Sequence, residues 1–209
     1  MNITIFGATD LLGKYLVRQA LALDNTVYAF GRNVFVSGFA KNESLHLLQG
    51  TLFDEHQVLN AIRNSDSIIA VINSPSDEFD KSRSLGIKNI VKQMQTENIK
   101  RLIVVGSIAV MEDESGDLLM EHPDFPVRDI ETGKEDLEVL KILKSSNLNW
   151  TFVALPPITD ADVTGLYQIE KNNLPINFDK KIKAGDAGLF ILNQLNKSEN
   201  SATKVAIYN

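Results

Sequence analysis

Residues 2–17 read NITIFGATDLLGKYLV, and this stretch decides how the rest of the sequence is interpreted. The apolar run at residues 3–6 predicts a short buried strand, and the residues after Gly13 have the spacing of an amphipathic helix. The turn between them begins with Gly7 and ends with Gly13, close to the G-x-x-G-x-x-G spacing of turns that bind phosphate. Asp10 stands where the middle glycine is expected.

Each position of such a turn has a physical role. Gly7 permits the tight bend, Gly13 lets the helix pack closely on the strand, and the helix N-terminus offers N–H groups to a phosphate. Asp10 as an N-cap stabilises the helix by roughly 1 kcal/mol. Beside a pyrophosphate, two unit charges about 4 Å apart repel by roughly 4 kcal/mol at an effective dielectric constant near 20. A carboxylate turned outward towards Lys14 or solvent avoids most of this repulsion, so dinucleotide binding stays an open question.

The rest of the chain alternates short apolar runs with amphipathic stretches. Runs such as 68–72 and 102–105 are apolar throughout, which is typical of parallel strands covered on both faces. We predict an α/β fold with a Rossmann-type doubly wound parallel sheet, in a single domain over residues 1–209 with a small pocket-forming extension after the sixth strand. Strands are expected at residues 2–6, 26–30, 45–48, 67–72, 101–106, 150–155 and 203–207, and helices at 11–23, 54–64, 79–98, 129–146 and 185–196.

Two stretches, residues 107–127 and 156–184, break this alternation. Each follows the carboxyl end of a strand, where open parallel sheets bind ligands, so each is a candidate wall of a substrate pocket. The acidic segment 111–121 is interpreted as a solvated face; if it lines the pocket instead, it repels anionic acceptors. His122 is the histidine placed nearest this pocket, and the three histidines lack the spacing of a metal site.

Composition limits the possible classes of function. The 209 residues are 44% apolar and 23% charged, and 21 basic against 27 acidic residues give a net charge of −6. The sequence has no basic stripe that would displace counterions from nucleic acid. It has no cysteine, which excludes disulfides and thiolate chemistry. No run approaches the roughly 18 apolar residues of a membrane span, and the start lacks a signal-peptide pattern. We therefore expect a cytoplasmic protein with no nucleic-acid or membrane partner.

Arg32 follows the expected second strand. An acidic residue at this point binds the ribose 2′-hydroxyl of NAD, whereas an arginine suits the 2′-phosphate of NADP. The residues therefore favour NADPH as the cofactor, and an exposed loop arginine without this role is the alternative.

The turn GATDLLG resembles the GATGxxG loop of atypical short-chain dehydrogenase/reductases, and the chain is most similar to the NADPH-binding flavin reductase/biliverdin-IXβ reductase group. The resemblance covers nearly the whole chain. It departs at Asp10, at Thr51 in place of an aspartate near the adenine, at Asn73 in place of a glycine, and at Ile158 in place of a histidine after paired prolines. The similar segments are GTLFD at 50–54, SLGIKNIV at 84–91, VVGS at 104–107, SNLNWTFV at 146–153, ALPP at 154–157 and VTGLY at 163–167.

The resemblance implies a set of site residues. Ser107 corresponds to the family's active-site serine and is the candidate catalytic residue. The pair Tyr167 and Lys171 has the Tyr-x-x-x-Lys spacing of short-chain dehydrogenases, but it lies outside their catalytic helix and is interpreted as a chance match. The residues implied in cofactor binding are Gly7, Thr9, Asp10, Leu11, Leu12, Gly13, Arg32, Asn33, Thr51, Leu52, Asn73, Ser74, Gly106, Ser107, Pro156, Pro157 and Ile158.

Three functions follow from these observations. The first is an NADPH-dependent reductase that transfers hydride to a flavin, a quinone or a similar flat aromatic acceptor, which needs little from the protein beyond holding two rings face to face. The second is a non-catalytic dinucleotide sensor with a protein partner. The third is a protein-interaction module whose cofactor binding is weakened or lost, which the residues at Asp10, Thr51 and Asn73 favour.

Overall fold

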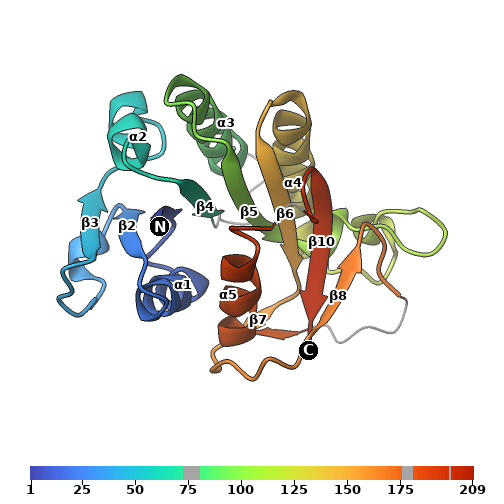
Figure 1. Ribbon diagram of the computed structural model, residues 1–209. Helices are drawn as coiled ribbons and strands as arrows, with labels where there is room; N and C mark the ends of the chain where they lie inside the picture. The colour runs from blue at the N-terminus through green and yellow to red at the C-terminus, as the bar shows by residue number, and fades with distance from the viewer. Residues whose placement is uncertain (73–80, 176–180, 198) are drawn as a thin grey trace.

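The apolar runs of the sequence form a mostly parallel sheet between two layers of helices (Figure 1). The computed structural model describes residues 1–72, 81–175, 181–197 and 199–209. The strands of the main sheet are β1 (Asn2–Phe6), β2 (Thr26–Gly31), β3 (Leu45–Gln49), β4 (Ser67–Val71), β5 (Arg101–Ser107), β6 (Asn149–Leu155), β8 (Gln168–Lys171) and β10 (Thr203–Tyr208). The helices are α1 (Leu11–Ala22), α2 (Glu55–Ile62), α3 (Ser82–Thr96), α4 (Val127–Ser145) and α5 (Ala184–Asn193).

The strands lie in the order β3-β2-β1-β4-β5-β6-β10-β8, and all these neighbours run parallel except β8, which pairs antiparallel with β10 at the edge. Helices α1 and α5 pack together on one face, while α2, α3 and α4 cover the other (Figure 1). The order of strands reverses between β1 and β4, and such a switch point is where open α/β sheets bind ligands. The predicted Rossmann-type doubly wound fold is confirmed.

Each central strand contributes to two hydrophobic clusters, which explains its continuous apolar sequence. In β4, Ile68 belongs to the cluster that includes Ile87 of α3, whereas Ile69 belongs to the cluster that includes Leu16 of α1. Successive side chains of a strand point to opposite faces, so a strand between two helix layers buries both sets. In the described residues no helix is long and apolar enough to cross a membrane.

The structure departs from the predicted elements after β6. Residues Ile158–Thr159 (β7) and Ile182–Lys183 (β9) form a separate two-stranded sheet, and β8 extends the main sheet. The sequence of β8, QIEK, has only one apolar residue and no apolar face. It is a strand because its backbone pairs with β10. Because residues 168–171 are extended, Tyr167 and Lys171 do not share a helix, and the Tyr167 ring packs edge-on against Phe190.

The turn between β1 and α1 is held by two close backbone approaches. Gly7 has a φ of +78°, and a Cβ on it would lie 1.7 Å from the carbonyl oxygen of Val71 in β4. A Cβ on Gly13 would lie 2.1 Å from the carbonyl oxygen of Gly7. The tight bend predicted at Gly7 is therefore present, and the absence of a side chain at Gly13 lets α1 pack closely on the turn that follows β1.

A buried arginine, bonded to uncharged oxygens among the described residues, fixes α5 to the sheet. Arg101 of β5 donates from Nη2 and Nε to the Gln194 carbonyl oxygen at 2.6 and 3.1 Å, and from Nη1 to Thr151 Oγ1 at 2.9 Å. Gln194 is the C-cap residue of α5, where a cation also meets the negative end of the helix dipole. Burial lowers the pKa of Arg101 to about 10, so the side chain stays charged at neutral pH.

The buried carboxylate of Asp186 organises the segment that follows β7. It accepts hydrogen bonds from Thr164 N and Gly165 N, both at 2.7 Å, from Thr164 Oγ1 at 2.7 Å and from Asn209 Nδ2 at 3.0 Å. Burial alone would raise the pKa of Asp186, but these hydrogen bonds outweigh it and hold the pKa below its ordinary value. The carboxylate thereby fixes residues 164–165 against the start of α5.

Gly7→Ala and Gly38→Ala form a matched pair that tests the backbone contact. The two glycines have φ values of +78° and +77°, but a Cβ on Gly38 meets nothing within 4 Å. Alanine at Gly38 should cost only the positive-φ strain, roughly 1 kcal/mol in the free energy of unfolding. Alanine at Gly7 should cost about 3 kcal/mol or more, because the turn must also move away from Val71. Equal losses in urea denaturation would show that the contact is not limiting.

Asp186→Asn should lower the free energy of unfolding at pH 7 by about 2 kcal/mol, because an amide cannot accept all the bonds that the carboxylate accepts. The folded pKa lies below the unfolded value of about 3.9, so this stabilisation is full above that pH and disappears as pH falls through the folded pKa. Denaturation curves at pH 7 and in acid measure the effect. Asp162→Asn, on an exposed carboxylate paired with Arg18, should change stability little at either pH. A difference between wild type and Asp186→Asn that grows in acid would contradict this account.

Candidate functional site

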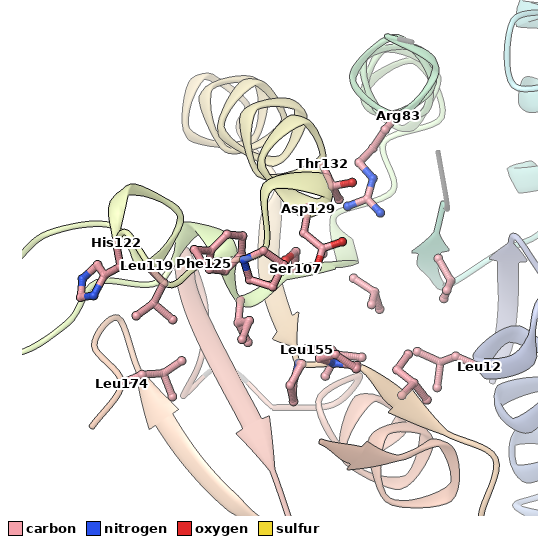
Figure 2. Close-up of a pocket in the computed structure, with 18 of the residues that line it drawn as sticks. Leu12, Arg83, Ser107, Leu119, His122, Phe125, Asp129, Thr132, Leu155 and Leu174 are labelled. Atoms are coloured by element: carbon pink, nitrogen blue, oxygen red, sulfur yellow. The ribbon is translucent and has the colours of Figure 1, made fainter. Parts of the chain in front are cut away.

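A cavity of about 620 Å³ opens at the carboxyl edge of the sheet, beside the turn after β1 (Figure 2). It lies at the ends of β4, β5 and β6 and at the start of α1, and the two long stretches predicted as pocket walls contribute to it. Its volume is in the range of small-molecule sites. The described residues that line it are Leu11, Leu12, Val71, Arg83, Val105, Gly106, Ser107, Ile108, Asp113, Leu119, His122, Asp124, Phe125, Pro126, Asp129, Thr132, Leu155, Pro156, Pro157, Ile158, Leu174 and Pro175.

The N-terminus of α1 reaches this cavity through Leu11 and Leu12. Asp10 is the N-cap residue, with φ −77° and ψ 169°, but within the described part of the chain its side chain makes no capping hydrogen bond to the helix. Of the two alternatives for Asp10, the structure thus lacks the side-chain capping bond, although Asp10 is the N-cap residue. Its carboxylate does not take up the first-turn N–H groups of α1, which have no partner within the helix itself.

The residues predicted to hold the adenosine end of a cofactor lie on the neighbouring strands. Arg32 and Asn33 follow β2, and Thr51 and Leu52 follow β3; these four are not among the described residues that line the cavity. Arg32 is exposed, and a Cβ on Gly31 before it would lie 3.0 Å from Thr9 Cγ2. The end of β2, one residue before Arg32, thus lies close to Thr9 of the turn. Asn73 and Ser74 lie outside the described residues.

Ser107 lies at the end of β5 and lines the cavity with Gly106. Its backbone N–H donates to Asp136 Oδ2 at 2.7 Å, and its hydroxyl oxygen accepts from Ala109 N at 3.1 Å. A hydroxyl that accepts one bond still has its own proton to donate. Pro156, Pro157 and Ile158, at the end of β6, line the same cavity.

The buried pair Arg83–Asp136 is the part of the site that sequence reasoning missed. Arg83 Nη1 contacts Asp136 Oδ1, and Asp136 has no exposed surface. Burial raises the pKa of the Asp136 carboxyl above its ordinary value, although the Arg83 guanidinium and the Ser107 N–H act in the opposite direction. The spacing of the sequence could have predicted the burial of Arg83, because it lies on the same face of α3 as the buried Ile87, Ile90 and Met94.

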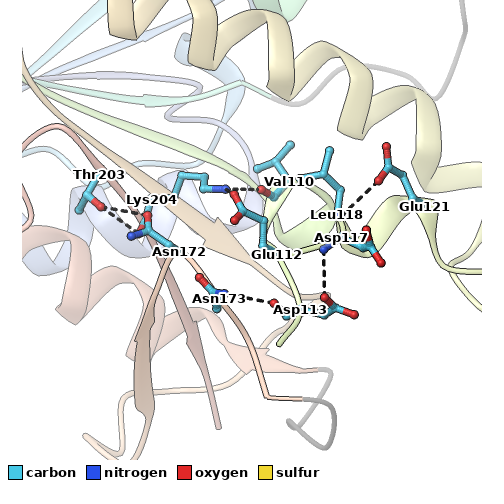
Figure 3. Close-up of polar contacts among 10 residues, drawn as sticks. All are labelled: Val110, Glu112, Asp113, Asp117, Leu118, Glu121, Asn172, Asn173, Thr203 and Lys204. Atoms are coloured by element: carbon cyan, nitrogen blue, oxygen red, sulfur yellow. Dashed lines mark hydrogen bonds and ion pairs between the residues drawn. The ribbon is translucent and has the colours of Figure 1, made fainter. Parts of the chain in front are cut away.

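The acidic segment after β5 is folded against the sheet edge rather than simply solvated (Figure 3). Lys204 of β10 donates from Nζ to Glu112 Oε1 and to the Val110 carbonyl oxygen, both at 2.8 Å. Asp113 accepts from Ser115 N at 2.7 Å and from Asp117 N at 3.0 Å. Of the charged residues at 111–121, Asp113 is the described one that lines the cavity.

His122 lies at the rim of the cavity, with its Nε2 3.1 Å from Asp113 Oδ2. Figure 2 shows it at the opposite end of the cavity from Leu12. Burial would raise the pKa of Asp113, but its hydrogen bonds from the backbone and the nearby His122 lower it overall. Among the described residues, no group of three or more histidine and carboxylate side chains is placed to hold a metal ion.

The sequence of this chain is similar to that of a known protein. A curated relative, the photosystem II assembly factor Ycf39 of Synechocystis sp. (strain ATCC 27184 / PCC 6803 / Kazusa), is 23% identical over 158 residues, which are 74% of this chain and 44% of the relative. This chain thus spans less than half the length of that relative.

Two solved structures have the same fold. A protein of Streptococcus pneumoniae TIGR4, provisionally assigned as an NADH-flavin reductase, has a TM-score of 0.83 at 21% identity, over 100% of this chain and 99% of the other. A short-chain dehydrogenase/reductase of Veillonella parvula DSM 2008 in complex with NADP has a TM-score of 0.81 at 17% identity, over 100% and 94% of the chains. The sequence model of the family described as NAD(P)H-binding matches residues 7–198, and this chain belongs to that family.

Proposed function

We propose that the chain is an NADPH-dependent reductase that transfers hydride to a flavin, a quinone or a similar flat acceptor. The observation that carries this proposal is the continuity of the cavity. Leu11 and Leu12, at the N-terminus that would hold phosphates, line the same space as Ser107 and the pair Pro156–Pro157. A cofactor bound at the turn and an acceptor in the cavity can therefore share one enclosed site.

The residues present fit a dinucleotide. The turn at Gly7 is tightly bent, and the first-turn N–H groups of α1 are not taken up by the Asp10 carboxylate. In this proposal Gly7, Thr9 and Gly13 hold the phosphates and Arg32 holds the 2′-phosphate. Ser107 and Pro156–Pro157 flank the nicotinamide, which supplies the hydride when the cofactor is bound. Ser107 can donate its hydroxyl proton in a hydrogen bond to the carboxamide or to the acceptor.

Asp10→Asn should tighten NADPH binding by about tenfold, because it removes a negative charge near the phosphates while keeping the shape of the residue. Wild-type protein should bind NADPH in the micromolar range, and isothermal titration calorimetry measures both values. Asp24→Asn, which removes a carboxylate at a left-handed position outside the site, should leave the affinity unchanged. Failure of both wild type and Asp10→Asn to bind NADPH would refute the dinucleotide role.

Arg32→Ala should weaken NADPH binding by about tenfold or more and leave NADH binding unchanged, since the two cofactors differ in the 2′-phosphate. Titration of both cofactors into both proteins gives the ratio of dissociation constants. An equal loss for NADPH and NADH would show that Arg32 does not read the 2′-phosphate.

A second function, a cofactor-binding module that acts on a protein partner without turnover, is favoured by the similarity to Ycf39, whose name describes an assembly factor. The loss of NADPH absorbance in the presence of flavin or quinone separates the two. Turnover supports the reductase, whereas NADPH binding without turnover of any such acceptor supports the second function.

A further inference from the structure

The polar wall of the cavity contains a guanidinium whose hydrogen-bonding capacity the protein does not use up. Arg83 is 6% exposed, and one of its terminal nitrogens contacts Asp136. Its Nε is buried and has no hydrogen-bond partner among the residues that the structure describes. A buried N–H without an acceptor is destabilising, and native proteins keep few of them. Arg83 also lines the cavity, so a molecule bound there can offer an acceptor to the part of the guanidinium that Asp136 does not occupy.

Asp136 keeps this donor in one place. Its Oδ1 contacts the guanidinium, and its Oδ2 accepts from the Ser107 N–H at 2.7 Å. Both carboxylate oxygens are thus used, and α3, α4 and the end of β5 meet at one fully buried side chain. Figure 2 shows Arg83 reaching from α3 towards Thr132 and Asp129 at the edge of the cavity. A donor held in this way selects the position of the acceptor atom.

The charge of the cavity selects the kind of ligand. Three carboxylates line it, those of Asp113, Asp124 and Asp129, and the charge of Arg83 is paired with Asp136. An anionic ligand would meet net repulsion, whereas an uncharged hydrogen-bond acceptor would not. The remaining lining is largely aliphatic and aromatic, including Leu12, Phe125, Leu155, Pro156 and Leu174, which suits a flat apolar ring.

We propose that the acceptor is an uncharged quinone, and that Arg83 is a specificity-determining residue whose guanidinium donates a hydrogen bond to one quinone carbonyl oxygen. This proposal rests on the proposed reductase function, because it names the acceptor of that same cavity. A quinone offers a flat ring and a neutral oxygen acceptor together. Flavin mononucleotide, by contrast, carries a phosphate that the three lining carboxylates oppose.

The test is ligand binding to the cofactor-free chain, measured by calorimetry with two matched pairs of probes. Menadione and methylnaphthalene differ in the carbonyl oxygens, and riboflavin and flavin mononucleotide differ in the phosphate. Wild type should bind menadione at least about tenfold more tightly than methylnaphthalene, as expected for one hydrogen bond from a charged donor. Riboflavin should bind more tightly than flavin mononucleotide.

Arg83→Lys keeps a cation for Asp136 but removes the guanidinium donors that Asp136 does not occupy. It should weaken menadione binding by about tenfold or more and leave methylnaphthalene binding unchanged. Arg63→Lys is the matched control, because Arg63 is exposed and pairs with Glu97 on the surface; it should bind both probes as wild type does. If Arg83→Lys does not fold, as judged by circular dichroism, the two probe comparisons on wild type decide the proposal.

Three results would overturn the proposal. They are equal affinity of wild type for menadione and methylnaphthalene, unchanged menadione binding by folded Arg83→Lys, and tighter binding of flavin mononucleotide than of riboflavin.

NADPH titrated into the same proteins separates this inference from the proposed function. Wild type that binds menadione through Arg83 but does not bind NADPH would leave the site standing and refute the reductase. Loss of NADPH binding in Arg83→Lys with menadione binding intact would assign the guanidinium to the dinucleotide.

Discussion

Gly7 and the carbonyl group of Val71 approach so closely that any side chain on the glycine would occupy the place of the oxygen. Because β1 and β4 are hydrogen-bonded neighbours at the switch point, this contact brings the turn down onto the end of β4. The start of α1 is carried with it to the edge of the cavity, where Leu11 and Leu12 line the wall. Gly13 then lets α1 continue against the turn itself. The position of the helix N-terminus relative to Ser107 and Pro156 therefore follows from a contact between backbones.

On the other side of the cavity a buried ion pair takes the place of apolar packing. Arg83 and Asp136 connect α3 to α4, and Asp136 also binds the end of β5. Such a pair is weak evidence for stability, because apolar residues of similar volume often stabilise a protein as well or better. Its position at the cavity wall instead gives this part of the fold a polar group in a fixed orientation. The two walls of the cavity are therefore positioned by different interactions. A backbone contact at a glycine positions one wall, and an ion pair positions the other.

The sequence predicted the fold well, and the reason is physical. The runs at 68–72 and 102–105 become central strands because both of their faces are covered. The strand β8 was missed because its pairing depends on the backbone edge of β10, which leaves no periodic signal in its own side chains. Asp10 is the N-cap residue, but its residue type alone could not decide whether the side chain bonds to the helix, because side-chain orientation depends on the surroundings. Of the candidate site, Ser107 and Pro156 to Ile158 were predicted to lie together and do so. Arg83 was missed because charged helix residues are normally exposed, and its pairing with Asp136 joins segments 53 residues apart.

Acid has a different effect on the attachment of α5, which depends on Arg101, than on the loop after β7. Within the described residues, its guanidinium donates to carbonyl, amide and hydroxyl oxygens, none of which takes up a proton in the acid range. The attachment of α5 to β5 and β6 therefore has no titrating partner to lose. The segment at 164–165 depends on a carboxylate that does protonate. Strong acid would therefore release the segment at 164–165 while the attachment of α5 to β5 and β6 persisted.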